Sequence, residues 1–259
     1  MDEVKLKPYL TKTRKRFDPL SILVSLGGLA AVVFSIAYQD DMDHFLDPRS
    51  ALVVVCGTFA SVIFQFDLKS FFIAITHVGA SFWGSPGKSI SNNLELLDEA
   101  ILRGMHFTEL KDGSSLNGDL LNDMVYMHRH GLLKEEIEDH IKHKINDHLL
   151  IRKTTVELLK KASIIAPALG LFGTVIGLIG VLRSLSDPTM IGPSMSLALM
   201  TTAYGAALGS LIFTPLAGRV EHHNTIYFNA YKQLVERAAV LIRREEVNLD
   251  EEFQPEIAV

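Results

Sequence analysis

Two long hydrophobic stretches, residues 162–182 and 194–218, dominate the second half of the chain. Neither contains Asp, Glu, Lys, Arg or His, and each is as long as the roughly 18–20 residues that cross a bilayer core as an α-helix. The polar break between them, residues 183–193, is short. This pattern predicts a membrane hairpin.

Two more hydrophobic stretches, Pro19–Tyr38 and Ala51–Phe66, lie near the N-terminus and are separated by an acidic segment. Residues 1–16 are rich in Lys and Arg, so the positive-inside rule places the N-terminus in the cytoplasm. A basic start before an apolar run also fits a cleavable signal peptide, but this run is longer than the usual 7–15 residues. We therefore expect an all-α, polytopic membrane protein with four transmembrane helices.

The region between the second and third spans is soluble in character and has helical periodicity. Aromatic and aliphatic residues from Phe71 to Trp83 predict an interfacial helix, and Ile137, Ile141 and Ile145 mark a long helix that continues into the third span. The C-terminal region begins as a helix and from Glu245 on reads as an acidic, disordered tail. The expected parts are a cytoplasmic N-terminal segment, transmembrane helices 1 and 2, a cytoplasmic helical domain, transmembrane helices 3 and 4, and a cytoplasmic tail, at residues 1–18, 19–66, 67–161, 162–218 and 219–259.

The composition of the chain argues against two classes of function, nucleic-acid binding and intramembrane enzyme activity. The 259 residues are 48% hydrophobic and 21% charged, with a net charge of −5. No basic stripe with interleaved aromatic residues is present, so nucleic acid is not an expected partner. The spans contain no nucleophile with a neighbouring base, which argues against an intramembrane enzyme.

The soluble region contains one group of residues that could bind a metal ion. Its acidic and imidazole side chains recur at three- and four-residue steps, which would place ligands on one helix face. No HExxH motif or cysteine pair accompanies them, so we interpret this face as solvated and expect neither metal nor cofactor. The residues are Asp139, His140, His143, Asp147 and His148.

Small residues form a stripe on each helix of the predicted hairpin. Lipid gives helices no hydrophobic reason to associate, so glycines matter because they allow close backbone approach. Their spacing of three and four residues puts them on one face and predicts tight helix packing. The glycines are Gly170, Gly173 and Gly177 on the first helix and Gly205 and Gly209 on the second.

Polar oxygens accompany these stripes. Thr174 and Thr202 are at similar depths, near mid-membrane, and their hydroxyls could face one site; alternatively each bonds the carbonyl one turn back. Pro167 and Pro215 free backbone carbonyls, which either bind a small cation or water or only accompany a kink. Threonine holds no net charge, so an ion relay here needs a carboxylate from another chain.

The residues of the hairpin resemble one family closely. Ala166-Pro167-Ala168-Leu-Gly170-Leu-Phe-Gly173-Thr174, Asp187-Pro188, Ala198-Leu-Met-Thr201-Thr202-x-Tyr204-Gly205 and Pro215-Leu-Ala are similar to the A subunits of flagellar motor stators, the MotA/PomA family. Four spans with one large loop between the second and third extend the resemblance along the chain.

The resemblance implies a stator in the bacterial inner membrane, with both termini in the cytoplasm. A homopentamer would surround two B-type (MotB/PomB-like) subunits, whose aspartate carries the ion, and would turn a FliG-like rotor switch protein. It implies an ion pathway along Thr174, Thr202 and Thr201, and conformational coupling through Pro167 and Pro215. Threonines at these positions favour transported sodium over protons, whereas Ile164 replaces an acidic residue of some sodium-type members.

Rotor contacts are the least defined part of the resemblance. The family pattern of Arg-x-Gly followed five residues on by Glu is shifted here, which makes Arg103 and Glu109 the candidates and a solvated loop the alternative. ExbB/TolQ-like energisers are the nearest rivals, but they have three spans and an outside N-terminus. A scaffold without ion coupling is a third possibility. The sequence indicates neither which B-type partner it uses nor whether the driven machine is a polar flagellum, a lateral flagellum or another rotary device.

Overall fold

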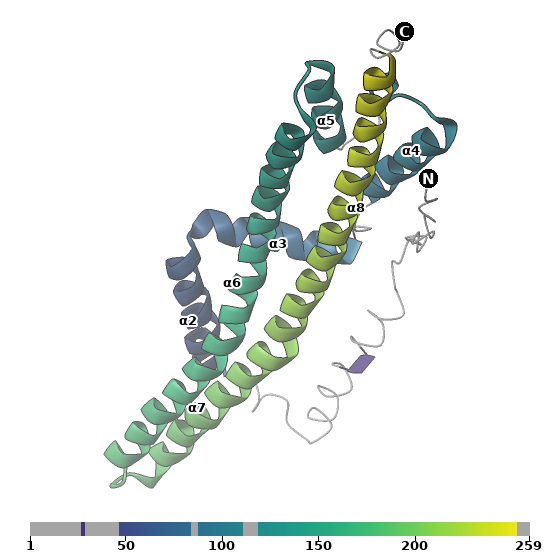
Figure 1. Ribbon diagram of the computed structural model, residues 1–259. Helices are drawn as coiled ribbons and strands as arrows, with labels where there is room; N and C mark the ends of the chain where they lie inside the picture. The colour runs from purple at the N-terminus through teal and green to yellow at the C-terminus, as the bar shows by residue number, and fades with distance from the viewer. Residues whose placement is uncertain (1–26, 29–46, 84–87, 111–118, 253–259) are drawn as a thin grey trace, which may run out of the picture. The chain divides into compact units, whose positions relative to one another are not determined.

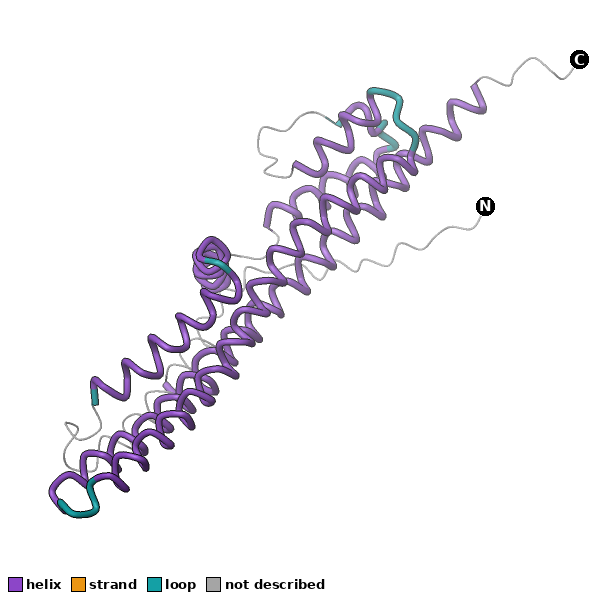
Figure 2. Tube along the Cα trace, turned by 90° about the vertical axis from the view of Figure 1, so that its left-hand side faces the viewer, coloured by secondary structure: helices purple, strands orange, loops and turns teal. Residues whose placement is uncertain are grey.

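The computed structural model describes residues 27–28, 47–83, 88–110 and 119–252. Every regular element within these ranges is helical (Figures 1 and 2). The predicted first span, Pro19–Tyr38, falls outside the described residues except for Gly27 and Gly28. Three described helical stretches are long and apolar enough to cross a membrane: Pro48–Phe66, Lys134–Arg183 and Pro188–Glu245.

The chain divides into two compact units. One contains residues 17–84 and 152–222, and the other contains residues 1–16, 85–151 and 223–259. Helix α6, Lys134–Arg183, contributes to both units, which confirms that the helix before the third span continues into it. Helix α8, Thr214–Glu252, also contributes to both. We call the unit of residues 17–84 and 152–222 the apolar unit, and the unit of residues 1–16, 85–151 and 223–259 the soluble-type unit.

The apolar unit contains α2 (Pro48–Phe66), α3 (Leu68–Trp83), α7 (Pro188–Ala206) and the π-helical η3 (Ala207–Phe213), beside its parts of α6 and α8. Helices α2 and α7 begin alike, with an aspartate N-cap followed by proline in the first turn. Asp187 accepts a hydrogen bond from the backbone N–H of Thr189 at 3.1 Å. The second hairpin helix therefore begins at Pro188, before the predicted end of the polar break.

Helix α3 turns sharply away from α2 at Asp67, and Figures 1 and 2 show it running across the direction of α2. Asp67 has a φ of 67°, which a non-glycine residue rarely adopts. Its carboxylate accepts a hydrogen bond from the N–H of Ser70 at 2.8 Å and so caps α3. At 16 residues, α3 is too short to span a bilayer readily, as expected for an interfacial helix.

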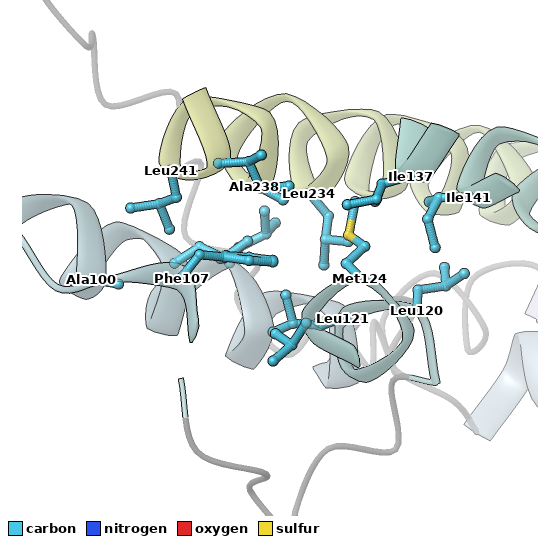
Figure 3. Close-up of a cluster of buried hydrophobic side chains, with 14 of the residues drawn as sticks. Ala100, Phe107, Leu120, Leu121, Met124, Ile137, Ile141, Leu234, Ala238 and Leu241 are labelled. Atoms are coloured by element: carbon cyan, nitrogen blue, oxygen red, sulfur yellow. The ribbon is translucent and has the colours of Figure 1, made fainter. Parts of the chain in front are cut away.

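The soluble-type unit packs α4 (Lys88–Arg103), the short 3₁₀ element η2 (Phe107–Glu109) and α5 (Asp119–Arg129) with its parts of α6 and α8. Figure 3 shows the core that these elements share. The predicted apolar row on α6 is buried, with Ile137 and Ile141 at 0% exposure. The core also includes Leu97, Phe107, Met124, Leu234, Ala238, Leu241 and Ile242.

The prediction of a disordered tail from Glu245 on is wrong for residues 245–252, whereas residues 253–259 lie outside the described part of the chain. Helix α8 continues to Glu252, and its residues up to Glu245 take part in the core region of the soluble-type unit. An apolar stripe on Leu234, Ala238 and Leu241, at three- and four-residue spacing, packs α8 into this core as far as Glu245. The acidic composition of the last residues concealed this stripe.

Candidate functional site

The α6–α7 hairpin is held together by close approach of the two backbones. A Cβ atom added to Gly170 would lie 2.8 Å from the carbonyl oxygen of Thr201, and one added to Gly205 would lie 2.6 Å from that of Ala166. Real Cβ atoms essentially never come so near, and neither neighbour is a flexible side chain. The two helices fit only because these positions have no side chain.

The same arrangement continues along the hairpin. A Cβ atom on Gly177 would lie 2.6 Å from the Cβ of Ala198, and Gly173 faces the side chain of Thr201. Helix α2 packs beside α7, where the Oη of Tyr204 accepts a hydrogen bond from the N–H of Asp47 at 3.1 Å. The glycines thus line one continuous contact.

The three threonines differ in their surroundings. Thr201 is fully buried, and its hydroxyl donates to the Leu197 carbonyl at 2.9 Å within its own helix. Thr202 lies at the helix contact, where its hydroxyl is 3.4 Å from the carbonyl oxygens of both Gly170 and Ala198. The Thr174 hydroxyl donates to the carbonyl of Leu171 at 2.6 Å. Thr174 and Thr202 therefore make the local hydrogen bonds of the alternative interpretation. Thr201 makes one as well, and the Thr202 hydroxyl also lies beside a carbonyl of α6.

The two prolines are connected through η3. Gly209, a residue of η3, packs on Pro167: an added Cβ would lie 2.7 Å from Cγ of that proline and 2.7 Å from the Ser163 carbonyl oxygen. Pro167 frees this carbonyl because it has no N–H to donate. Thr214 directly follows η3 and directly precedes Pro215. Its hydroxyl donates a hydrogen bond to the Gly209 carbonyl at 2.8 Å.

At Pro215 the sequence left open either a freed carbonyl that binds a cation or water or a simple kink, and it did not predict this π-helix. Local π-turns are one way in which a helix accommodates the carbonyl that a proline frees, and such π-turns concentrate at functional sites. Seven residues, Ala207–Phe213, adopt this geometry. Sequence periodicity gives no signal for it, because the apolar pattern of the segment is equally compatible with an α-helix.

Arg103 and Glu109 flank a short, anchored segment of the soluble-type unit. Arg103 pairs with Glu99 at 2.5 Å on α4, with side-chain exposures of 67% and 51%, and Glu109 is exposed on η2. Between them, Phe107 is fully buried. The two charged side chains thus lie at the surface, near a fixed point in the chain.

Beside this segment is a carboxylate that sequence analysis assigned to a disordered tail. Glu245 of α8 has a side-chain exposure of 7%; its two oxygens lie 3.2 Å from Nδ1 of His106 and 2.5 Å from Nε2 of His128. We call Glu245, His106 and His128 the Glu245 cluster. The sequence could have predicted that Glu245 is buried, because it follows Leu241 by four residues and so lies on the same buried face of α8.

The acidic and imidazole residues of α6 that suggested a metal site lie on its exposed side. His143 lies 3.7 Å from Asp139 on the same helix, and both side chains are about three-quarters exposed, at 77% and 76%. Within the described residues, no group of three or more potential ligands is arranged to hold a metal ion. His143 instead borders a groove of about 700 Å³ between α6 and α8.

Comparisons with known proteins agree on one family. The model of the MotA/TolQ/ExbB proton channel family matches residues 112–233. Motility protein A of Cereibacter sphaeroides is 30% identical over 214 residues, covering 81% of this chain and 83% of that protein. Chemotaxis protein PomA of Vibrio alginolyticus is 28% identical over 207 residues, covering 78% of this chain and 80% of that protein.

Solved structures show the same fold. A chain of the C. jejuni MotAB structure has a TM-score of 0.73 at 19% identity and covers 87% of this chain and 90% of that one. A chain of the flagellar MotAB stator complex from Bacillus subtilis has a TM-score of 0.71 at 18% identity, with coverage of 93% and 94%.

Proposed function

Because the chain belongs to the MotA/TolQ/ExbB proton channel family, whose motility proteins it matches along most of its length, we propose that it is the A subunit of a flagellar motor stator. It is a membrane channel protein, not an enzyme. With a B-type partner, it would convert an ion gradient into torque on the rotor. The observation that carries this proposal is the pair of charge-free stretches, residues 162–182 and 194–218, whose helices pack backbone to backbone.

Because the two apolar stretches of the hairpin carry no charged side chain, a partner subunit would have to supply one. Residues 162–182 and 194–218 contain no Asp, Glu, Lys, Arg or His, although an ion relay at mid-membrane needs a group that binds and releases charge. A B-type subunit would supply this group as an aspartate on its single span. Several copies of this chain, five as the family resemblance implies, would surround the B-type spans in the inner membrane. The full topology would have four spans and both termini in the cytoplasm.

Sodium is the proposed ion, with protons as the alternative. Hard oxygen ligands suit a small cation, and the Thr202 hydroxyl lies beside the Gly170 carbonyl oxygen. Thr174, on the other hairpin helix, provides a second hydroxyl. We assign Thr201 a supporting place in the pathway, because its buried side chain fills the space opposite Gly173.

Pro167 and Pro215 would couple ion binding to movement. Gly209 of η3 lies against Pro167, and η3 ends two residues before Pro215. A π-turn that converts to an α-turn shifts the helix that follows, so a change at the ion path would alter the start of α8. Arg103 and Glu109 would contact a rotor switch protein, since both charges are exposed on the soluble-type unit.

The test is complementation of cells that lack their own stator A subunit, with the native B-type partner expressed alongside. Wild type is expected to restore swimming, whereas Thr174→Ala with Thr202→Ala should abolish it while the complex still assembles. Thr76→Ala is the matched control, because Thr76 makes the same local bond, to the Ile73 carbonyl at 2.7 Å, on α3. Swimming by the double variant at wild-type speed would remove these threonines from the ion path.

A further inference from the structure

The segment between α4 and α5 is held at more points than its irregular structure suggests. Gly104, with a φ of 67°, ends α4 in a Schellman-type turn in which the Met105 N–H bonds the Ala100 carbonyl at 3.0 Å. Phe107 then enters the core, and Arg129 of α5 donates to the Leu110 carbonyl at 3.3 Å. The exposed charges of Arg103 and Glu109 are therefore attached to a segment with a defined backbone.

The Glu245 cluster adds a polar anchor to this segment. His106 is the residue immediately before η2, His128 is on α5, and Glu245 is on α8, so one carboxylate joins three separate elements. Each carboxylate oxygen has its own imidazole partner. The ring of His128 also packs edge-on against Phe107, with centroids 5.7 Å apart.

A carboxylate is an unusual choice at this place in the molecule. Its neighbours along the same face of α8, Leu241 and Ile242, are each 1% exposed, and an aliphatic residue at position 245 would continue their packing. Burying a carboxylate is unfavourable unless hydrogen bonds satisfy it. Hydrogen bonds are directional, so the Glu245 carboxylate holds the imidazoles of His106 and His128 in one position relative to α8. Aliphatic contacts would not do this.

We propose that Glu245 is a positioning residue: through His106 and His128 it fixes the segment that presents Arg103 and Glu109 to the rotor. This inference rests on the proposed function, because only a rotor partner gives the orientation of this segment a consequence. Helix α8 thereby controls the rotor-facing surface of its own unit from within the unit.

The first experiment measures hydrogen exchange in the solubilised complex of the full chain with its B-type partner. Glu245→Gln keeps the size of the side chain but removes its charge. We expect exchange in peptides covering residues 104–110 to accelerate on the order of tenfold, because their local opening becomes easier. Peptides covering residues 137–145 of α6, in the same core, should keep their wild-type rates.

The second experiment measures how long fluorescently tagged stator units stay at the motor, together with swimming speed. Glu245→Gln and His106→Gln should each shorten this residence and slow swimming, with unchanged membrane level and co-purification of the partner. The double variant should be no worse than either single one, because both remove the same interaction. Glu245→Asp should recover part of the residence. His130→Gln is the control: this histidine directly follows α5, and its Nδ1 lies 2.7 Å from the carbonyl oxygen of Tyr126 at the end of that helix.

The two experiments separate the inference from the function beneath it. If wild type drives no motility, the stator proposal fails, whereas the exchange experiment still tests whether the cluster holds the segment. If wild type swims but exchange at residues 104–110 is unchanged in both single variants, the inference is overturned. Accelerated exchange with wild-type residence at the motor also overturns it, because the segment would then not need to be fixed. His106→Gln removes a half-exposed side chain, so it remains informative if Glu245→Gln fails to fold.

Discussion

The α6–α7 contact and the core of the soluble-type unit are both helix packings, yet they use opposite side chains. In the hairpin, glycines meet backbone atoms, whereas large apolar side chains such as Leu171, Phe172 and Leu199 are more than half exposed. In the soluble-type unit, Phe107, Leu97 and Met124 are at most 1% exposed. Water drives large apolar groups into a core, whereas lipid does not, so only close backbone approach and dispersion favour the hairpin contact.

The difference makes each region sensitive to the opposite change in size. The largest effect should follow a deletion in the soluble-type unit. Phe107→Ala removes a fully buried ring, and loss of transfer free energy plus an unfilled cavity should destabilise the unit by about 3–5 kcal/mol. Thermal unfolding of the purified complex measures this. Phe107→Leu should cost clearly less; equal losses for the two variants would mean that the ring does not fill the site.

The hairpin should respond instead to an addition. Gly205→Ala would place a Cβ 2.6 Å from the Ala166 carbonyl oxygen and 3.1 Å from Cα of Gly170, and backbone must move to relieve the clash. We expect a loss of about 1–3 kcal/mol in the same thermal assay. The control is Gly192→Ala on α7, where an added Cβ has no atom within 4 Å. This variant should be neutral or slightly stabilising, since alanine favours helix.

Ion pairs within the soluble-type unit give a smaller contrast, between partly buried and exposed positions. Arg237 pairs with Asp98 at 2.6 Å, with side-chain exposures of 15% and 26%, and also donates to the Leu94 carbonyl. Arg237→Leu should cost about 1.5–3 kcal/mol, the range for hydrogen bonds of charged groups. Lys232→Leu, which breaks the exposed pair with Glu236 at 3.8 Å, should cost no more than about 1 kcal/mol. Comparable losses would contradict burial as the deciding factor.

The smallest expected effect is a pH dependence in α3. Burial, and next the charge of Arg152, lowers the pKa of His77 below its ordinary value of 6.5, while the ring shares a 2.9 Å hydrogen bond with Thr155. A lowered pKa means that the unfolded chain takes up the proton first. His77 therefore contributes stability that is fully present above about pH 6.5 and is lost as the pH falls through its folded pKa.

Comparing wild type with His77→Gln isolates this contribution. Between pH 7.5 and pH 5.5, wild type should lose more thermal stability than the variant, because glutamine does not titrate and retains a partner for Thr155. Parallel pH profiles for the two proteins would show that protonation of His77 is not linked to folding.

Sequence reasoning predicted the regions in which one physical signal dominates. Absence of charge marked the hairpin, and glycine spacing placed Gly170 and Gly205 on the faces that the structure brings together. Isoleucine spacing predicted the core face of α6, with Ile137 and Ile141 fully buried. In each case the local pattern and the tertiary contact agree.

Three features of the structure were not predicted from the sequence, each for a specific physical reason. The Asp187-Pro188 pair was interpreted as part of a polar break, although aspartate followed by proline is a helix start. The π-helix before Pro215 depends on backbone geometry that no residue spacing encodes. Glu245 was assigned to a tail because its neighbours are acidic, and its partners, His106 and His128, are more than 100 residues away in sequence.

The measurement that tests the central claim most directly is swimming speed as external sodium is varied at fixed pH and membrane potential, in cells that depend on this protein and its B-type partner. Our account predicts a speed that rises with sodium and saturates, and a weaker response in Thr202→Ala, which removes the hydroxyl beside the Gly170 carbonyl. A speed that ignores sodium and collapses with a proton uncoupler would contradict it, and Thr174 and Thr202 would then serve packing alone.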